Sequence, residues 1–515
     1  MARVVLIRPP SVFSAASASA PVTMPLSLAY LSASLLKAGH EALCIDALGE
    51  GIDRIAVSYG PKVRYRGLSD AEIVERIGPQ PDAIGVTTMF SQDWPHVEGL
   101  IRAARARFPK TAIIVGGEHA TACVDYLLRE CPEVDFVASG EGEETIVEFA
   151  EFLDGRRRKE DIAGLHFRGA GGEPVHNPAR ARMREIGRIP WPAWQLFDLE
   201  PYFRVGEGHG VERGRSMPIV ATRGCPYQCT FCSNPLMWTT RYVMRDPAEV
   251  LDEIEHYLKD YRADNIDFYD LTAVVKKDWV LAFCREIARR GLVFSWQLPS
   301  GTRSEAIDAE VLSAMAASGC RNMTYAPESG SEAVLEAIKK KVKLPRLYES
   351  IRCAKREKIF VKCNLIIGFP RETRWDMLRT VWSAVRFAFL GVDDCGLYTY
   401  SPYPGSELYD YLLKTGAIPK VDRRYFESLM TFMDISQPTN YCENVGAREI
   451  AFYRLLGLSL FYGLSYLLHP SAVLRTWRNW LAGRSDTVIE QRVFALLRRP
   501  ALSRERKHPV GAPTN

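Results

Sequence analysis

The run Cys225-Pro-Tyr-Gln-Cys229-Thr-Phe-Cys232 places three cysteines within eight residues and constrains this chain more than any other feature. A cubane iron–sulfur cluster contains four irons and normally binds one thiolate at each. Three cysteines at this spacing leave one iron open to a small molecule. The alternative is a structural zinc site, which needs a fourth ligand to close its tetrahedron. The nearest candidates, His209 and His256, are not at a short ligand spacing from the cysteines, so we predict an iron–sulfur cluster.

Length and composition predict an intracellular enzyme with several domains. A chain of 515 residues exceeds the size at which a single core stops growing, so two or three domains are expected. The 12 cysteines have irregular spacings that do not indicate a disulfide framework. Without a convincing signal peptide, this favours a reducing, cytoplasmic location. The net charge of +4 is too small to indicate nucleic-acid binding.

Residues 1–153 alternate short apolar runs with amphipathic stretches, which predicts a doubly wound parallel sheet. Strands are expected at 4–7, 42–46, 83–87, 112–115 and 136–138, and helices at 26–38, 71–77, 94–107 and 145–153. A Ser/Ala-rich loop is expected at 11–20. Ligands of such sheets bind beyond the carboxyl ends of the strands, so the candidate binding loops are 87–91, 116–119 and 139–143.

The next two segments predict a connector and a partial barrel. Residues 154–214 contain a hairpin around 169–172 and the Pro- and Trp-rich run 189–194, which suits a rigid strap between domains. Residues 215–410 predict six strand–helix units, with strands at 218–222, 265–270, 293–298, 321–326, 360–367 and 395–400. Six parallel strands form three quarters of a (β/α)8 barrel, with one side open to a large substrate and the active site at the carboxyl ends of the strands.

Residues 411–515 predict a helical cap that packs on the open barrel. The apolar run 455–468 has fourteen residues, whereas a helix that crosses a bilayer needs about twenty. Residues 473–481 are rich in Arg and Trp, and 471–515 contain nine Lys or Arg against three Asp or Glu. Such a segment can lie in the membrane interface, so peripheral contact with the inner face of the membrane is the alternative. A disordered basic end is expected from Arg504.

The cysteine run, with an aromatic residue just before its last cysteine, resembles the signature of the radical S-adenosylmethionine (SAM) enzymes. In that family SAM chelates the open iron, and an electron from the reduced 4Fe-4S cluster splits SAM into methionine and a 5′-deoxyadenosyl radical. The N-terminal region resembles the cobalamin-binding domain that precedes the radical domain in one class of these enzymes. The resemblance covers residues 1–410 and implies three cofactors: a 4Fe-4S cluster on Cys225, Cys229 and Cys232, SAM, and cobalamin.

The resemblance also implies which loop residues contact cobalamin: Ser91, Gly116, Gly117, Glu118, His119, Gly140, Glu141 and Gly142. The DxHxxG motif, whose histidine ligates cobalt in many cobalamin proteins, is missing; residues 46–51 after the second strand read Asp-Ala-Leu-Gly-Glu-Gly. Radical enzymes of this class commonly lack the motif. His119 is a candidate substitute, but we expect it to face water in a turn.

At the barrel mouth, the resemblance implies a SAM site built from the ends of successive strands. Asp270 would meet the amino end of SAM. Arg303 would meet the methionine carboxylate, or it would pair with Glu305 or Asp308 on the next helix. Both alternatives for Arg303 stay open.

Two later strand ends complete the implied SAM site. Glu328 would contact the ribose or amino group of SAM, while Ser329 and Ser331 can satisfy the free N–H groups of the following helix. Gly368-Phe369-Pro370 begins a Gly-Phe-Pro-x-Glu-Thr run that resembles the adenine-side motif of the family. Its backbone amides would read the adenine edge, and Gly368 would allow close approach.

The class implies methyl transfer to an unactivated carbon as the leading hypothesis. Cob(I)alamin would take a methyl group from one SAM to give methylcobalamin, and a second SAM would supply the radical that removes hydrogen from the substrate. The alternative is oxidation or ring closure of the kind performed by anaerobic magnesium-protoporphyrin cyclases, which share this domain order. We expect a large or lipophilic small-molecule substrate, such as a lipid, tetrapyrrole or natural product, and a low-potential donor of the flavodoxin or ferredoxin type.

Two other functions are disfavoured. A methylthiotransferase needs three further cysteines at strand ends of the N-terminal domain, and Cys44, Cys123 and Cys131 are not placed there as a set. Such an enzyme also ends in a small β-barrel, whereas this tail is predicted to be helical. A non-catalytic cobalamin sensor is disfavoured because the cluster cysteines are intact.

Overall fold

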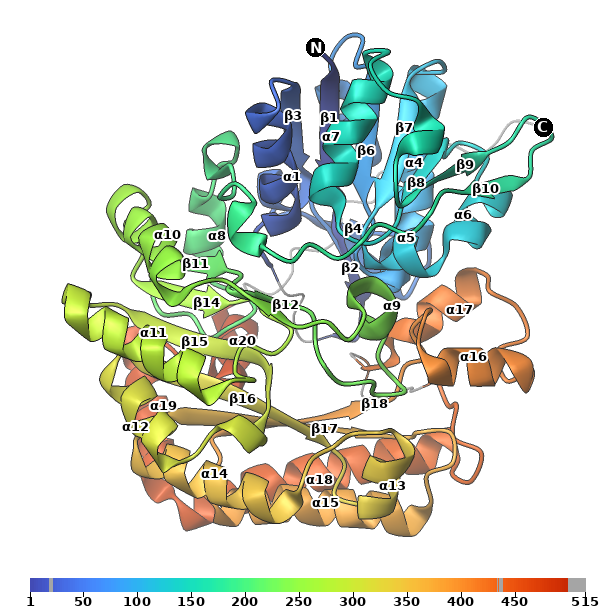
Figure 1. Ribbon diagram of the computed structural model, residues 1–515. Helices are drawn as coiled ribbons and strands as arrows, with labels where there is room; N and C mark the ends of the chain where they lie inside the picture. Colours follow the sequence, from blue (N-terminus) through green and yellow to red (C-terminus); the bar gives the residue numbers. More distant parts are fainter. Residues whose placement is uncertain (18–21, 433, 435–438, 499–515) are drawn as a thin grey trace.

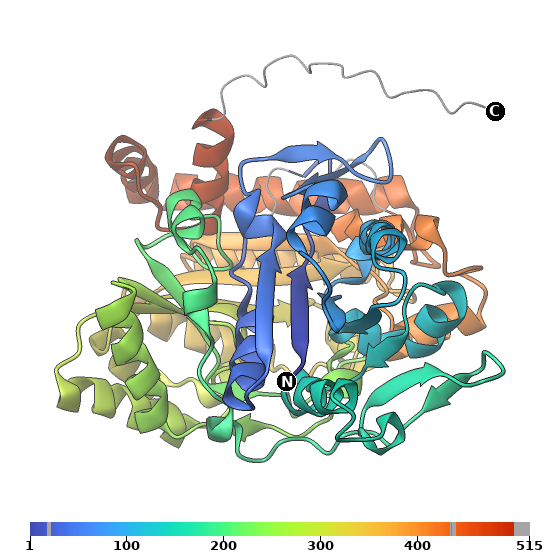
Figure 2. The same cartoon turned by 90° about the horizontal axis from the view of Figure 1, so that it is seen from above.

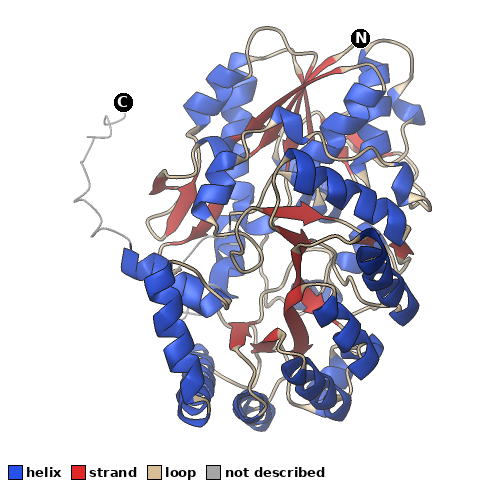
Figure 3. Cartoon of the chain, turned by 90° about the vertical axis from the view of Figure 1, so that its left-hand side faces the viewer, coloured by secondary structure: helices blue, strands red, loops and turns tan. Residues whose placement is uncertain are grey.

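Figure 1 shows the computed structural model of the protein, in which an N-terminal sheet with its helices lies above a second, curved sheet that is surrounded by helices. The structure describes residues 1–17, 22–432, 434 and 439–498. The disordered end predicted from Arg504 therefore lies outside the described residues. Figure 3 shows that helices cover both sheets on their outer sides.

The N-terminal sheet has seven strands in the order β10-β9-β8-β7-β6-β1-β3. Its first five strands in the chain pair in parallel, as the sequence predicts, and the expected hairpin adds β9 and β10 antiparallel at one edge. The strands are β1 (Arg3–Arg8), β3 (Glu41–Asp46), β6 (Ala83–Thr87), β7 (Ala112–Gly116), β8 (Phe136–Ala138), β9 (Leu165–Arg168) and β10 (Pro174–His176).

Helices bury both faces of this sheet. Val4 and Leu6 of β1 share one core with Phe149 of α7 (Gly142–Leu153), and α1 (Leu26–Lys37) packs beside α7 on that face. Val5 and Ile7 point the other way, into the core that contains residues of α3 (Asp70–Arg76) and α4 (Trp94–Arg107). A parallel sheet covered on both faces needs apolar residues at consecutive positions. This is why its strands read as continuous apolar runs, and the predicted α/β class is confirmed.

The prediction of a loop at 11–20 is wrong for residues Ser11–Ser14. Residues Ser11–Ser14 form β2, which pairs antiparallel with β5 (Val63–Arg66), and β5 also pairs with β4 (Ile55–Val57). The partner strands lie far along the chain, and β4 is exposed throughout. No local apolar pattern marks this small sheet; residues 18–21 lie outside the described part.

The second sheet is parallel throughout, in the order β11-β14-β15-β16-β17-β18. This confirms the predicted partial (β/α)6 barrel. Its strands are β11 (Ser216–Ile219), β14 (Asn265–Phe268), β15 (Ser295–Thr302), β16 (Cys320–Glu328), β17 (Phe360–Ile367) and β18 (Asp394–Thr399). The connecting helices are α10 (Pro247–Asp260), α11 (Lys277–Arg290), α12 (Ala309–Ala317), α13 (Glu332–Ala337), α14 (Leu344–Arg356) and α15 (Arg374–Phe389).

The C-terminal region is helical, as predicted, but its main helix is longer than the apolar run suggested. That run belongs to α18 (Ala447–Leu468), which by length and composition is sufficient to cross a bilayer, with a mean hydropathy of 1.3 over its most apolar 18 residues. The argument from a length of fourteen residues is therefore wrong. The packing of α18 indicates another role, because it lies against α15 and β18 and its buried Arg454 donates to the Leu397 carbonyl at 2.7 Å.

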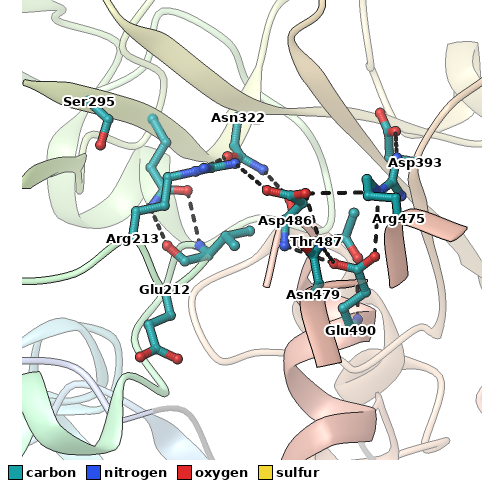
Figure 4. A network of polar contacts seen from close by, with 12 residues as sticks. Glu212, Arg213, Ser295, Asn322, Asp393, Arg475, Asn479, Asp486, Thr487 and Glu490 are labelled. Carbon is teal, nitrogen blue, oxygen red and sulfur yellow. Dashed lines mark hydrogen bonds and ion pairs between the residues drawn. The ribbon is translucent and has the colours of Figure 1, made fainter. Parts of the chain in front are cut away.

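Two segments outside the barrel sequence pack against its central strands, β15 and β16. Val211 of the connector exchanges two hydrogen bonds with the Gln297 side chain of β15, at 3.0 and 2.8 Å. Beside it, Arg213 donates to Asn322 of β16, and Asn322 donates to the Asp486 carbonyl (Figure 4). The same network includes Arg475 of α19 (Pro470–Ala482), and it fastens α19 and α20 (Val488–Arg498) to the barrel.

The rest of the C-terminal region reaches the N-terminal sheet. α16 (Glu407–Lys414) and α17 (Arg423–Ser428) follow the last barrel strand, and α17 contacts α4. The Phe426 ring of α17 lies edge-on to His119, with centroids 5.8 Å apart. In the view of Figure 2, the C-terminal helices, in orange and red, lie along one side of the molecule.

Candidate functional site

The three motif cysteines lie on one loop that follows β11, between the short strand β12 (Thr222–Arg223) and α9 (Asn234–Trp238). Gly224 starts this loop with φ of +87°, and a Cβ there would lie 2.1 Å from the Arg241 carbonyl oxygen. Only glycine fits this position. Further along, the Thr230 amide donates to the Ile338 carbonyl at 3.1 Å, and the Arg303 guanidinium lies 3.7 Å from the Tyr227 ring centroid. These contacts hold the loop at the carboxyl ends of the barrel strands.

The donor set fits a cubane better than a single metal ion. Among the residues that the structure describes, no three His, Cys, Asp or Glu side chains converge on one point suited to an ion. A zinc knot requires such convergence, whereas each thiolate of a cubane binds a different iron. His256 pairs with Asp260, and His209 lies 3.2 Å from Ser300 Oγ. Burial raises the pKa of Cys232 to about 12, so deprotonation there requires the compensating charge of bound iron.

A buried ion pair that the sequence interpretation missed lies beside this loop. The Lys340 ammonium is 2.9 Å from Glu328 Oε1, and both side chains are nine-tenths buried. Burial raises the pKa of the Cys229 thiol, and the nearby cations of Lys340 and Arg303 oppose this increase. Lys340 sits in a run of three lysines, which in sequence is indistinguishable from a solvated segment.

Glu328 has a backbone φ of +70°, at an irregularity in the pairing of β16 with β17. A non-glycine residue in this region costs about 1–3 kcal/mol and usually marks a functional constraint. Nearby, Ser329 Oγ accepts at 3.1 Å from the amide of Ser331, which precedes α13, so this bond does not satisfy an N–H group within the helix. The Ser331 hydroxyl instead donates to Asp376, so it does not cap the helix.

Arg303 and Asp270 both have partners within the protein. Of the two alternatives for Arg303, the structure has the pair with Glu305, at 3.3 Å, together with a hydrogen bond to the Lys341 carbonyl. Asp308 is engaged elsewhere, by Lys277. Asp270 accepts from the amides of Ala221 and Thr222 and from the Thr222 hydroxyl. Asp270 therefore fixes the turn that leads into the cysteine loop, and its contact with SAM stays a prediction.

The Gly368-Phe369-Pro370 turn is held by an acidic side chain. The amides of Gly368 and Phe369 donate to Glu372 Oε2, at 2.6 and 3.1 Å, and their contact with adenine stays a prediction. A Cβ on Gly368 would meet Ile450 of α18 at 3.3 Å. The Phe369 ring packs between Phe231 of the cysteine loop and Tyr400, so the turn supports that loop.

His119 does not face water, which corrects the expectation. Its side chain is buried, its Nδ1 lies 2.9 Å from Ser91 Oγ, and its ring stacks on Trp94. Desolvation lowers the pKa of His119 to about 3. The turn after β7 is covered by α4 and by Phe426, a contact between residues far apart in sequence that no local pattern shows.

Two acidic residues predicted to contact cobalamin link the N-terminal sheet to the cysteine loop. Glu118 accepts from Ser233, the residue after Cys232, at 2.5 Å. Glu141 accepts from Arg182 at 2.8 Å and pairs with Arg223 at 3.2 Å, and Arg223 lies directly before the loop. The carboxyl ends of the two parallel sheets therefore face each other across one interface.

The N-terminal side of this interface has features that suit a large, flat ligand with amide groups. Met89 and Phe90 follow β6 and are 45% and 55% exposed, although they lie at the edge that faces the barrel. Gln92 Oε1 and Asp93 Oδ1, in the next turn, are buried and without a hydrogen-bond partner in the described structure. Gly117 has φ of +125°, and a Cβ there would lie 2.7 Å from the Thr88 carbonyl oxygen. Apolar cover with unpaired acceptors fits a corrin ring and its side-chain amides.

The glycines and the serine of the predicted cobalamin set lie around the same edge. Gly116 ends β7, Ser91 begins the turn before α4, and Gly142 begins α7. Gly140 has φ of +76°, and no atom lies within 4 Å of a Cβ built there. Gly140 therefore leaves room for a ligand, and the contacts of all four positions with cobalamin stay predictions.

The connector supplies cavity-lining residues that the sequence interpretation did not assign. His209 lies 5.6 Å from the Tyr269 ring and, with Lys362, lines a cavity inside the barrel. A second cavity beside it is lined by Tyr202, Tyr269 and several glycines of the connector. The Gly-rich run 206–214 was the available signal for this loop.

Comparison with known proteins agrees with this arrangement. The Radical SAM superfamily model matches residues 219–381, and the B12 binding domain model matches residues 15–150. An uncharacterized methyltransferase of Pyrococcus horikoshii is 27% identical, with 85% of this chain and 89% of that protein covered. The cytidylyl-2-hydroxyethylphosphonate methyltransferase of Streptomyces wedmorensis is 29% identical, with 78% and 80% covered.

Two further similarities concern an alternative activity and the fold. An anaerobic magnesium-protoporphyrin IX monomethyl ester cyclase of Rubrivivax gelatinosus is 24% identical over 75% of this chain and 66% of that protein. The fold resembles that of TsrM from Kitasatospora setae, a radical SAM methyltransferase solved with cobalamin and a 4Fe-4S cluster. The TM-score is 0.63 at 19% identity, with 81% of this chain and 79% of that chain covered.

Proposed function

We propose that this chain, a cobalamin-dependent radical SAM enzyme with a 4Fe-4S cluster, transfers a methyl group to an unactivated carbon of a large or lipophilic small molecule. The observation that supports this most directly is the contact between Glu118 and Ser233. Through it, the predicted cobalamin loop adjoins the cysteine loop. A methyl donor and a radical source on adjoining loops would hold the substrate carbon close to both, which is the main contribution of positioning to catalysis.

The chain's own residues would bind and orient the cofactors, which supply the methyl and radical chemistry when bound. Cys225, Cys229 and Cys232 would hold the cluster, and the cations of Lys340 and Arg303 would balance the negative charge of the thiolates and of the SAM carboxylate. The proposed SAM contacts remain Asp270, Arg303, Glu328, Ser329, Gly368, Phe369 and Pro370. The proposed domains are 1–153, 154–214, 215–410 and 411–515.

The second candidate is oxidation or ring closure without methyl transfer. Three curated relatives are named as anaerobic magnesium-protoporphyrin IX monomethyl ester cyclases, at 24 to 26% identity. Relatives named as methyltransferases match at up to 29% identity and over more of this chain, which favours methylation. For either reaction the enzyme needs a reductant, and we propose a flavodoxin or ferredoxin.

The decisive experiment needs no substrate. The anaerobically reconstituted protein is loaded with cobalamin, reduced, and given SAM that carries a labelled methyl group. Label recovered on the extracted cobalamin, with an equal amount of S-adenosylhomocysteine, is the expected result. Accumulation of 5′-deoxyadenosine with unlabelled cobalamin would favour the cyclase-like reaction instead. A Cys229→Ala protein controls for cluster-independent cleavage, and a wild-type protein that binds no cobalamin would refute the proposed role of residues 1–153.

A further inference from the structure

Three helices, α15, α18 and α19, carry large apolar side chains that are exposed to solvent. In Figure 1, α15 and α18 lie at the bottom and α19 at the left. We call this surface the tryptophan face. Trp375, Trp382 and Trp477 are 63%, 55% and 60% exposed. Soluble monomers rarely expose contiguous apolar patches larger than a few hundred Å². A surface with this many large exposed side chains therefore indicates a binding partner.

The tryptophan face is continuous from one helix to the next. α15 and α18 pack side by side, and α19 follows α18 after His469. The His469 side chain also ties the corner to α15, because its Nε2 lies 3.0 Å from the Ala388 carbonyl. On α18, which lies against α15 and precedes α19, Leu455 and Leu467 are 51% and 78% exposed.

α15 shows that its exposed residues are not part of the barrel core. Trp375, Trp382 and Phe389 recur every seven residues and lie along one outward line of the helix. The opposite side, with Met377 and Ala384, is fully buried against the barrel. The helix needs only one apolar side to pack there, so its second apolar side has no role within the described chain.

The charges on this face are almost all positive. α15, α18 and α19 contain seven arginines, no lysine and two acidic residues. The two acids are already engaged: Asp376 accepts from Thr373 and Ser331, and Glu449 pairs with Arg374. The remaining exposed arginines border the apolar side chains: Arg379, Arg386, Arg448 and Arg478.

We propose that the tryptophan face binds the surface of an anionic lipid bilayer, with α15, α18 and α19 lying in the plane of the headgroups. Tryptophan side chains favour the membrane–water interface, and arginines on the same face attract anionic headgroups. A second copy of the chain fits less well, because a two-fold contact would place the same positive charges opposite each other. Residues 499–515 are net basic, so they do not complement this face either.

Binding at the surface, rather than insertion, follows from how α18 is held. Its Arg454 is buried and donates to the carbonyls of Leu397, Phe432 and Asp434. Withdrawal of α18 into a bilayer would break these bonds and uncover β18. The proposal does not depend on the reaction at the site between the two sheets, so its test is separate from that of the proposed function.

The test is co-sedimentation of the full-length protein with vesicles of phosphatidylcholine alone or with 30% phosphatidylglycerol. We expect binding to the anionic vesicles that is lost in high salt, because screening weakens the attraction of exposed charges. Trp382→Gln/Trp477→Gln should weaken binding at least tenfold. Trp191→Gln removes an exposed tryptophan of the connector, outside this face, and should bind like the wild type. Arg386→Glu/Arg478→Glu should also weaken binding at least tenfold, since each basic residue near such a surface contributes roughly a fivefold factor.

Several results would overturn the proposal. One is equal sedimentation with neutral and anionic vesicles, or sedimentation with neither. Another is unchanged binding by a double-tryptophan variant whose circular dichroism matches the wild type. Resistance to alkaline carbonate extraction would indicate a spanning helix instead. A lipid-free dimer that the tryptophan substitutions dissociate, seen by analytical ultracentrifugation, would assign the face to a second copy.

Discussion

Replacement of Lys340 by Met is expected to destabilise the barrel strongly. The Lys340 ammonium lies 2.9 Å from Glu328 Oε1, and the two side chains are 10% and 9% exposed. At this distance and an effective dielectric constant of 20, the attraction is about 6 kcal/mol, much of which offsets the cost of removing both charges from water. Removal of one partner leaves the other charge buried and unpaired, which costs about 3–5 kcal/mol. We expect Lys340→Met to lower the free energy of unfolding by that amount.

Urea denaturation of the iron-free protein, followed by circular dichroism, measures this effect. Lys339→Met is the matched control, because the side chains of Lys339 and Glu407 are 52% and 60% exposed and an exposed pair contributes about 0–1 kcal/mol. The double variant Glu328→Gln/Lys340→Met should recover most of the loss, since it leaves no buried charge. Equal effects of Lys340→Met and Lys339→Met, or strictly additive effects in the double variant, would refute the reasoning.

Three further predictions concern buried groups. Burial lowers the pKa of His119 to about 3, so below about pH 6.5 the unfolded chain binds a proton that the folded chain does not. The wild type therefore loses stability as the pH falls from 7 to 5, and His119→Gln should reduce this loss by about 2 kcal/mol, as measured by urea titration at both pH values. Burial raises the pKa of Glu372 to about 8, so the folded chain holds a proton that the unfolded one releases, and stability falls as the pH rises from about 4.5 to 8. The stability of Glu372→Gln relative to the wild type should therefore rise by about 3 kcal/mol between pH 5 and pH 8. Glu372→Ala should be less stable than Glu372→Gln at every pH, because two amides lose their acceptor. Arg223→Met removes the buried partner of Glu141 and Glu143 and should lower the free energy of unfolding by about 3–5 kcal/mol. In calorimetry, the N-terminal sheet and the barrel should then melt separately, and an unchanged single transition would contradict this.

The sequence predicted most of the strands and little of what surrounds them. Strand β17 occupies the predicted residues 360–367, and every second residue of it, Val361, Cys363, Leu365 and Ile367, is buried. The sheet formed by β2, β5 and β4 was missed because its strands are distant in sequence and β4 is exposed. The position of the cysteine loop followed from the rule that sites lie at the carboxyl ends of barrel strands.

Individual side chains were harder to predict than the loops that contain them. The burial of His119 depends on Phe426, and the pairing of Lys340 depends on the fold of the segment between it and Glu328. Both contacts arise only when separate elements pack together. The amides of the Gly368 turn illustrate the same limit, because a motif indicates a turn without showing that Glu372 accepts from it.

The packing of outside segments against the central strands β15 and β16 has a consequence for the folding of the barrel. Val211 from one flank of the barrel bonds to Gln297, and Asp486 from the other flank bonds to Asn322. The barrel sequence is thus completed by residues that lie before its first strand and long after its last one. Excised at residues 215–410, it would expose Gln297 and Asn322 without these partners. In a chimaera that exchanges barrels between relatives, the connector and the last two helices should be transferred together with the barrel as one cooperative unit.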